Sequence, residues 1–213
     1  MGSSRPYLIL VLPLRHRGFL KNTRSAYLSL LVLAIAISGA FAQTTKPAPK
    51  SKLFDAAQLL RDIETLSSDE MEGRSPTQPS VAKGREYVKL RFTESGLEPV
   101  GANFEQPFEI KRRGTGTVAG VNYVGLIKGS KFPEKYIVIT AHYDHVGIRD
   151  GKIYNGADDN ASGTSALFAL ASYFKKNRPD HSMIFVAFDA EEMGLQGARH
   201  FVGNLPVPKE SIL

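Results

Sequence analysis

The sequence contains no cysteine among its 213 residues. Disulfide bonds and cysteine nucleophiles are therefore excluded. No Gly-x-Ser-x-Gly segment is present either, which removes the serine hydrolases that carry this motif. If such a chain is exported, its stability must come from an apolar core or from bound metal.

Acidic residues are missing from positions 1–42, although the whole chain has 21 of them. The same segment carries five cations, which are Arg5, Arg15, Arg17, Lys21 and Arg24. The formal net charge of +6 therefore falls mostly on this segment, and residues 43–213 are nearly neutral, with 22 basic and 21 acidic side chains. A nearly neutral body gives no electrostatic reason to expect a nucleic-acid partner.

The chain also lacks a hydrophobic run of membrane-spanning length. The apolar run at residues 28–37 has ten residues, whereas a transmembrane helix needs about 20. Basic residues precede this run and the small-x-small sequence Ser-Gly-Ala-Phe-Ala follows it, a pattern typical of secretory signal peptides. We therefore expect residues 1–42 to be a signal peptide, with an N-terminal membrane anchor as the alternative. Cleavage would leave an exported protein, periplasmic or secreted, with no stable membrane span.

The first half of the remaining chain changes from a helical to a strand-like pattern. Residues 43–53 are polar, contain proline and are predicted to be a linker. Apolar residues at helical spacing predict helices over residues 55–66 and 81–94, with a polar loop over 67–80 between them.

A period of two then predicts strands over residues 104–111, 118–127 and 136–140. The last of these is continuously apolar or β-branched, as expected of a strand that is covered on both faces.

The second half alternates between helix and strand. The pattern predicts a helix over residues 162–175 capped by Ser162, a buried strand over 182–188 and a helix over 191–202. This alternation predicts an α/β fold of three layers, in which a mostly parallel or mixed central sheet has helices on both faces.

Acidic and histidine side chains follow two of the predicted strands and precede one helix. They are His142 and Asp144 after residues 136–140, Asp189, Glu191 and Glu192 after 182–188, and Asp158 and Asp159 before 162–175. In an open α/β sheet, ligands gather beyond the carboxyl ends of the strands. Imidazole nitrogens and carboxylate oxygens are zinc ligands. The three clusters together therefore predict a zinc site.

Spacing within these clusters indicates different roles for neighbouring residues. His142 and Asp144 are two positions apart, so on an extended segment their side chains point the same way. The imidazole can then bind metal while the carboxylate fixes its tautomer. Glu191 and Glu192 are adjacent and point apart, so one can bind metal while the other takes a proton from an activated water.

Three segments of the chain resemble a known family. They are Ala-His-Tyr-Asp-His (141–145), Gly-Ala-Asp-Asp-Asn-Ala-Ser-Gly (156–163) and Ala-Glu-Glu-Met-Gly (190–194). Their order is similar to that of the three leading motifs of the bacterial co-catalytic dinuclear zinc aminopeptidases. That family also includes the peptidase domains of the transferrin-receptor and glutamate-carboxypeptidase type.

The resemblance covers about residues 55–213 and implies both a fold and an activity. Residues 54–213 are expected to form part of a zinc exopeptidase-like domain. The implied enzyme is an aminopeptidase that hydrolyses the N-terminal peptide bond of a peptide or protein with two zinc ions.

The resemblance also implies roles for individual residues. His142 would bind the first zinc ion and Glu192 the second, while Asp159 would bridge both. Glu191 would be the general base and Asp144 would orient His142. A cis peptide bond is expected after Asp159.

Members of the family supply an additional aspartate to the first zinc and an additional histidine to the second, from positions that follow residues 207–213. The resemblance therefore predicts that the chain is the N-terminal portion of a longer peptidase domain. His16, His181 and His200 are expected to be structural or solvent-exposed. His145 lies closer to the site, and a role in binding substrate or supporting the ligands is the alternative to a structural one.

Two other functions stay open at this point. One is a catalytically incompetent fragment, or a binding module that uses the same cleft. The other is a single-zinc glutaminyl cyclase, a relative with similar acidic motifs. His142 argues against the cyclase, because such enzymes keep one metal and do not need the histidine of the first site.

Overall fold

The structure is a computed structural model that describes residues 51, 53–112, 114 and 116–213. The predicted signal peptide and most of the predicted linker lie outside these residues. Among the described residues, no helix combines the length and the apolar character needed to cross a membrane.

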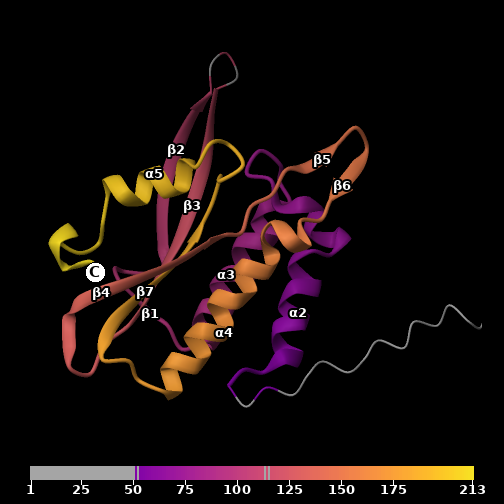
Figure 1. Cartoon of the computed structure of the whole chain (residues 1–213). Coiled ribbons are helices and arrows are strands. Elements are labelled where there is room, and N and C mark those ends of the chain that lie inside the picture. Colours follow the sequence, from indigo (N-terminus) through magenta and orange to yellow (C-terminus); the bar gives the residue numbers. More distant parts are fainter. Residues whose placement is uncertain (1–50, 52, 113, 115) are drawn as a thin grey trace, which may run out of the picture. The chain divides into compact units, whose positions relative to one another are not determined.

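A mixed five-stranded sheet forms the centre of the described part (Figure 1). Its strands are β1 (Glu98–Pro99), β2 (Glu105–Arg112), β3 (Gly116–Ile127), β4 (Phe132–His142) and β7 (His181–Phe188). The order is β1-β3-β7-β4, and β2 also pairs with β3. The β4–β7 pair is parallel, whereas β3 pairs antiparallel with β1, β2 and β7.

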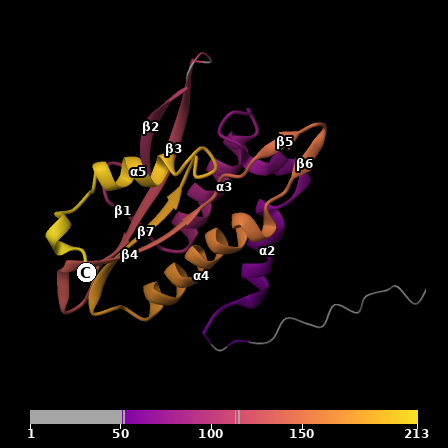
Figure 2. The same cartoon turned by 45° about the horizontal axis from the view of Figure 1, so that its top comes forward.

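Helices cover both faces of this sheet, as the sequence predicts (Figures 1 and 2). The helices are α2 (Ala56–Leu66), α3 (Val81–Glu94) and α4 (Ser162–Lys176) on one face, and α5 (Gln196–Gly203) on the other. The α/β fold class with a mixed sheet and helices on both faces is thus confirmed.

Strand β7 explains why both faces need cover. Phe185 belongs to the core cluster beneath α3 and α4, where Phe92 and Phe168 pack edge to face with each other. Ile184 and Val186 point the other way and pack with Phe201 of α5. Alternate residues of β7 therefore pack into two hydrophobic cores, one on each face of the sheet, which places β7 in the middle of the domain.

Strand β4 is an edge strand of the described sheet. It lies at one end of the strand order, and the side chain of Ile137 is 40% exposed. Only a short pairing with the last residues covers its outer edge in the described chain, through a bridge from Tyr136 to Ile212. Both faces of β4 nevertheless pack against core residues, through Ile139 and Ala141 on one side and Tyr136 and Val138 on the other. The predicted cover of its faces is therefore present, while an apolar run alone does not distinguish a central strand from an edge strand.

Several short elements were not predicted from periodicity. The expected loop over residues 67–80 contains the 3₁₀ helix η1 (Asp69–Arg74). A two-stranded hairpin, β5 (Gly147–Arg149) and β6 (Lys152–Tyr154), follows β4. The segments η2 (Ala157–Ala161) and η3 (Lys209–Ser211) precede α4 and the last residues. Each is too short to show a hydrophobic period.

Candidate metal centre

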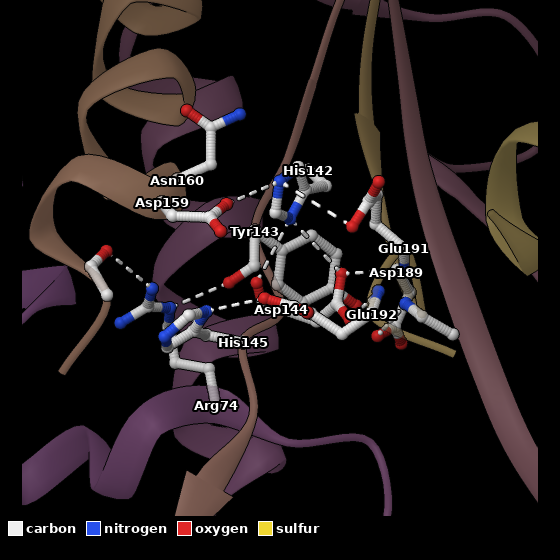
Figure 3. Close-up of polar contacts among 12 residues, drawn as sticks. Arg74, His142, Tyr143, Asp144, His145, Asp159, Asn160, Asp189, Glu191 and Glu192 are labelled. Atoms are coloured by element: carbon white, nitrogen blue, oxygen red, sulfur yellow. Dashed lines mark hydrogen bonds and ion pairs between the residues drawn. The ribbon is translucent and has the colours of Figure 1, made fainter. Parts of the chain in front are cut away.

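The three acidic segments meet beyond the carboxyl ends of β4 and β7 (Figure 3). Strands β4 and β7 are parallel neighbours, and His142 at the end of β4 is paired with Phe188 at the end of β7. The residues that follow the two strands must therefore emerge side by side. The loop that leads into α4 adds Asp159 from a third direction.

His142 is held in a defined tautomer. Its Nδ1 donates a hydrogen bond of 3.1 Å to the backbone carbonyl oxygen of Asp144. The Asp144 carboxylate is farther away, with Oδ1 at 3.6 Å from the same nitrogen. Because Nδ1 carries the proton, Nε2 of the neutral ring is left free as an electron-pair donor. That atom lies 3.0 Å from Oδ1 of Asp159 and 3.9 Å from Oε2 of Glu191.

Burial and charge act in opposite directions on the pKa of His142. Removal of the ring from solvent lowers this pKa, but the neighbouring Asp144 and Glu191 carboxylates raise it by more, so the net shift is upward. The pKa of the Asp144 carboxyl group is also raised, chiefly because the side chain is buried. The electron-pair donors of this centre therefore sit in an acidic and partly dehydrated environment.

Asp144 has a second task that its position in the sequence did not reveal. Its carboxylate accepts the backbone N–H of Glu191 at 3.0 Å and that of Glu192 at 3.3 Å. These two bonds connect the segment after β4 with the segment after β7. Asp144 thus fixes the backbone from which both glutamate side chains project.

The last helix begins later than predicted. The sequence predicts a helix from residue 191, but α5 starts at Gln196. Gly194 and Leu195 adopt positive φ angles of 89° and 60°, which interrupt a right-handed helix. The prediction of a helix over 191–195 is therefore wrong.

A second cluster lies next to His142 and shares Asp159 with it. One ligand atom each from His145, Asp159 and Glu192 lies within 4.8 Å of the others, a separation that a single metal ion can bridge. Nδ1 of His145 donates to Oε1 of Glu192 at 2.7 Å. Sequence reasoning left His145 outside the ligand set. Its place in the same post-strand segment as His142 was the only available signal.

The loop that carries Asp159 has the backbone feature implied by the family resemblance. The peptide bond between Asp159 and Asn160 is cis. The predicted cap of the following helix is wrong, however. Oδ1 of Asn160 accepts the N–H of Gly163, whereas the hydroxyl of Ser162 donates back to the carbonyl oxygen of Asp158.

Arg74 supports this end of the sheet from below and was missed entirely by sequence reasoning (Figure 3). The side chain is fully buried, and it donates to the carbonyl oxygens of Tyr143 at 2.7 Å, Asn155 at 2.7 Å and Gly156 at 3.1 Å. It also donates to the carbonyl oxygen of Leu66. Burial lowers the pKa of Arg74 to about 10, although the nearby Asp144 and Asp159 oppose the shift. One cation thus joins α2, the end of β4 and the loop of Asp159.

Gly84 provides the space for this arginine. A Cβ atom at position 84 would lie 3.3 Å from Cγ of Arg74. Glycine is unfavourable inside a helix, and at position 84 of α3 it leaves room for the Arg74 side chain.

Asp189 does not join the metal cluster, although the sequence places it beside Glu191. Its side chain is buried, and Oδ2 accepts from Arg85 Nη2 at 2.7 Å and from the N–H of Val121 at 3.0 Å. Asp158 is exposed and outside the cluster as well. Among the remaining histidines, His181 stacks on Phe132 and His200 on Phe108, while His16 lies outside the described residues.

Comparison with known proteins identifies the kind of domain that carries this site. Residues 122–212 match the family model described as Peptidase family M28. This segment therefore resembles peptidases of that family. The M28 segment contains His142, Asp144, His145, Asp159 and the glutamate pair, whereas Arg74 lies before it. The resemblance read from the three motifs is thus confirmed.

Curated relatives of the M28 segment are longer than this chain. A probable zinc metalloprotease of Leptosphaeria maculans is 34% identical over 116 residues, which are 53% of this chain and 24% of that protein. Aminopeptidase YwaD of Bacillus subtilis is 40% identical over 85 residues, which are 39% of this chain and 18% of that protein. The chain thus spans about a quarter or less of the length of these relatives.

Solved structures share the fold at low sequence identity. A Zn-dependent exopeptidase from Parabacteroides distasonis superposes with a TM-score of 0.60 and 19% identity, over 73% of this chain and 57% of that one. A glutaminyl cyclase from Fimbriiglobus ruber gives a TM-score of 0.59 and 22% identity, over 78% of this chain and 62% of that one. Both kinds of enzyme therefore have this fold, and the likeness does not separate their chemistries.

Proposed function

We propose that this protein is an exported zinc-dependent aminopeptidase that uses two metal ions. One observation carries the proposal: the carboxylate of Asp159 approaches both Nε2 of His142 and the ligand atoms of His145 and Glu192. A carboxylate in this place can serve two metals at once. The match of residues 122–212 to a peptidase family, and the name of the aminopeptidase relative, support the reaction class.

The donor set fits zinc. The available atoms are imidazole nitrogens and carboxylate oxygens, both of which zinc accepts. His142 and Asp159 would hold one ion, while Asp159, Glu192 and His145 would hold the other. When bound, zinc supplies a Lewis acid that polarises a carbonyl group and lowers the pKa of water.

Glu191 is the best candidate for the general base. It projects toward His142 with Oε2 at 3.9 Å from Nε2, and its side chain is one third exposed (33%). In the described part of the chain, its carboxylate accepts no hydrogen bond from a protein donor. A carboxylate that is close to the centre but not committed to a partner can take a proton from water and return it to the leaving amine.

Asp144 would keep this base in place. Because its carboxylate holds the N–H groups of both glutamates, it sets the direction of Glu191 toward the substrate and of Glu192 toward metal. Its backbone carbonyl keeps Nε2 of His142 available. Asp144 is thus proposed as the residue that positions a metal ligand and the base together.

The substrate would be the N-terminus of a peptide or protein outside the cytoplasm. Support for export comes from the order of basic, apolar and small residues within positions 1–42. Fractionation of the native host, with N-terminal sequencing of the mature protein, tests this part. A new N-terminus at Gln43 is expected, whereas a cytoplasmic protein beginning at residue 1 would contradict it.

The activity is tested by measuring zinc content and product together. The protein is expected to bind about two zinc ions and to release free amino acids from peptide N-termini. Formation of pyroglutamate from N-terminal glutamine, with one bound zinc, would assign a glutaminyl cyclase instead. Absence of both zinc and turnover would assign an incompetent fragment or a binding module.

A further inference from the structure

A pocket of about 250 Å³ opens directly beside the candidate metal centre. Its walls come from the segment from Ser75 to Gln78, the end of β2, the segment from His145 into strand β5, and the residues Glu192 and Met193 after β7. His145 and Glu192 belong to both the pocket and the metal cluster. A group bound in the pocket would therefore lie next to the reacting bond.

Two arginines give this pocket its charge. Arg112 comes from the end of β2 and Arg149 from the end of β5. All 21 acidic residues of the chain lie in the described part, and none of them forms an ion pair with either arginine there. Glu192 is the single acid of the lining, and it already bonds to His145. The pocket therefore carries an excess of uncompensated positive charge.

The wall that carries Arg149 is fixed rather than adaptable. The side-chain amide of Gln78 accepts the N–H of Ile148 at 3.0 Å and donates to its carbonyl oxygen at 3.1 Å. The amide thus bonds to the backbone of β5 in the way that a neighbouring strand would. These bonds hold β5 against the segment before α3. The hydroxyls of Ser75 and Thr77 are hydrogen-bonded to each other at 3.0 Å on the same wall, which leaves one O–H group able to donate to an anion.

We propose that this pocket selects substrates with a carboxylate side chain on a residue next to the scissile bond. The inference rests on the proposed aminopeptidase function and names its substrate class. Guanidinium groups match carboxylates in shape and charge, and a hydroxyl on the pocket wall can donate a further hydrogen bond to the bound carboxylate. An uncharged side chain of the same size would leave both arginines unpaired.

The test compares tripeptides that differ only by charge. Glu-Ala-Ala is compared with Gln-Ala-Ala, and Ala-Glu-Ala with Ala-Gln-Ala, each added to the zinc-loaded protein. Binding is measured by calorimetry in a Glu191→Gln background, and hydrolysis in the unaltered protein. In at least one pair, the glutamate peptide is expected to bind about tenfold more tightly than its glutamine isostere. The preference should shrink as salt is raised from 20 to 500 mM, because both arginines are exposed.

Variants of the two pocket arginines test whether these residues cause the preference for glutamate peptides. Arg112→Gln with Arg149→Gln is expected to reduce the Glu/Gln ratio to about one. Lys152→Gln is the matched control, because it removes a cation from the same hairpin outside the pocket lining. Equal binding of both isosteres by the unaltered protein, or a ratio that survives in the double variant, would overturn the inference.

The two readouts separate this inference from the proposed function. Hydrolysis of both isosteres at equal rates and with equal affinity would refute the preference for acidic substrates. It would still support the proposed aminopeptidase activity. An arginine-dependent preference in binding, without hydrolysis of any peptide, would support the pocket and refute the aminopeptidase.

Discussion

Nε2 of His142 and Oδ1 of Asp159 lie 3.0 Å apart, and the same Asp159 carboxylate is within 4.8 Å of ligand atoms from His145 and Glu192. This carboxylate is the junction of two potential ligand groups. It is also the most exposed of the four side chains, at 63%. An exposed aspartate surrounded by electron-pair donors has little structural reason to be there, which makes it the most informative place to probe metal binding.

Asp159→Asn should remove metal without disturbing the fold. The amide has nearly the same shape but no negative charge, so it is a poor bridging ligand. We expect zinc content measured by mass spectrometry to fall by at least one ion per chain, with little change in the far-ultraviolet circular dichroism spectrum. Asp158→Asn is the matched control, because Asp158 is adjacent, exposed and outside the cluster. Full zinc content in Asp159→Asn would refute the bridging role.

Glu191→Gln should separate catalysis from metal binding. A glutamine keeps the size of the side chain but cannot accept a proton from water. We expect zinc content to be unchanged and the rate of peptide hydrolysis to fall by about 10²–10⁴-fold. Hydrolysis at the unaltered rate, or loss of zinc from this variant, would show that Glu191 is not the base.

Arg74→Met tests the support beneath the centre. The variant would leave four buried carbonyl groups, those of Leu66, Tyr143, Asn155 and Gly156, without their donor. We expect the free energy of unfolding, measured with urea, to fall by about 3 kcal/mol or more, because each buried group that loses its partner is costly.

The control for this experiment is Arg61→Met. Arg61 is exposed on α2 and bonds only to the side chain of Gln58 among described residues. Its loss should change stability by no more than about 0.5 kcal/mol. Equal effects of the two substitutions would mean that the buried contacts of Arg74 contribute little.

The parts of this fold that were predictable from sequence are those set by local pattern. Helix α3 begins and ends where the apolar spacing predicts, at Val81 and Glu94. His142, Asp159 and Glu192 could be found because strand ends and helix entries concentrate function, and because their motifs resemble a known family. These signals operate within about ten residues of chain.

The parts that were missed depend on contacts between distant segments. Arg74 bonds to residues 69 and 82 positions away, and nothing in its own neighbourhood records those partners. The role of Asp144 in holding the backbone of Glu191 likewise spans 47 positions. The helix predicted from residue 191 does not start there because the backbone enters the left-handed region at Gly194 and Leu195, which the apolar spacing does not record.

Gly147→Ala should loosen the hairpin that borders both the metal cluster and the arginine pocket. Gly147 has a φ of +81°, and a Cβ atom there would run into the side chains of Ser75 and Gln78. Gly151 has a similar φ of +71° but nothing within 4 Å of its Cβ position, so Gly151→Ala reports the backbone cost alone. That cost is about 1–2 kcal/mol. Because Gly147→Ala adds a steric clash, we expect it to lower the free energy of unfolding by at least about 1 kcal/mol more than Gly151→Ala. The amides of β5 should also exchange faster with deuterium, since the Gln78 bonds to Ile148 would break. Equal stability of the two variants would mean that Gln78 does not anchor the hairpin.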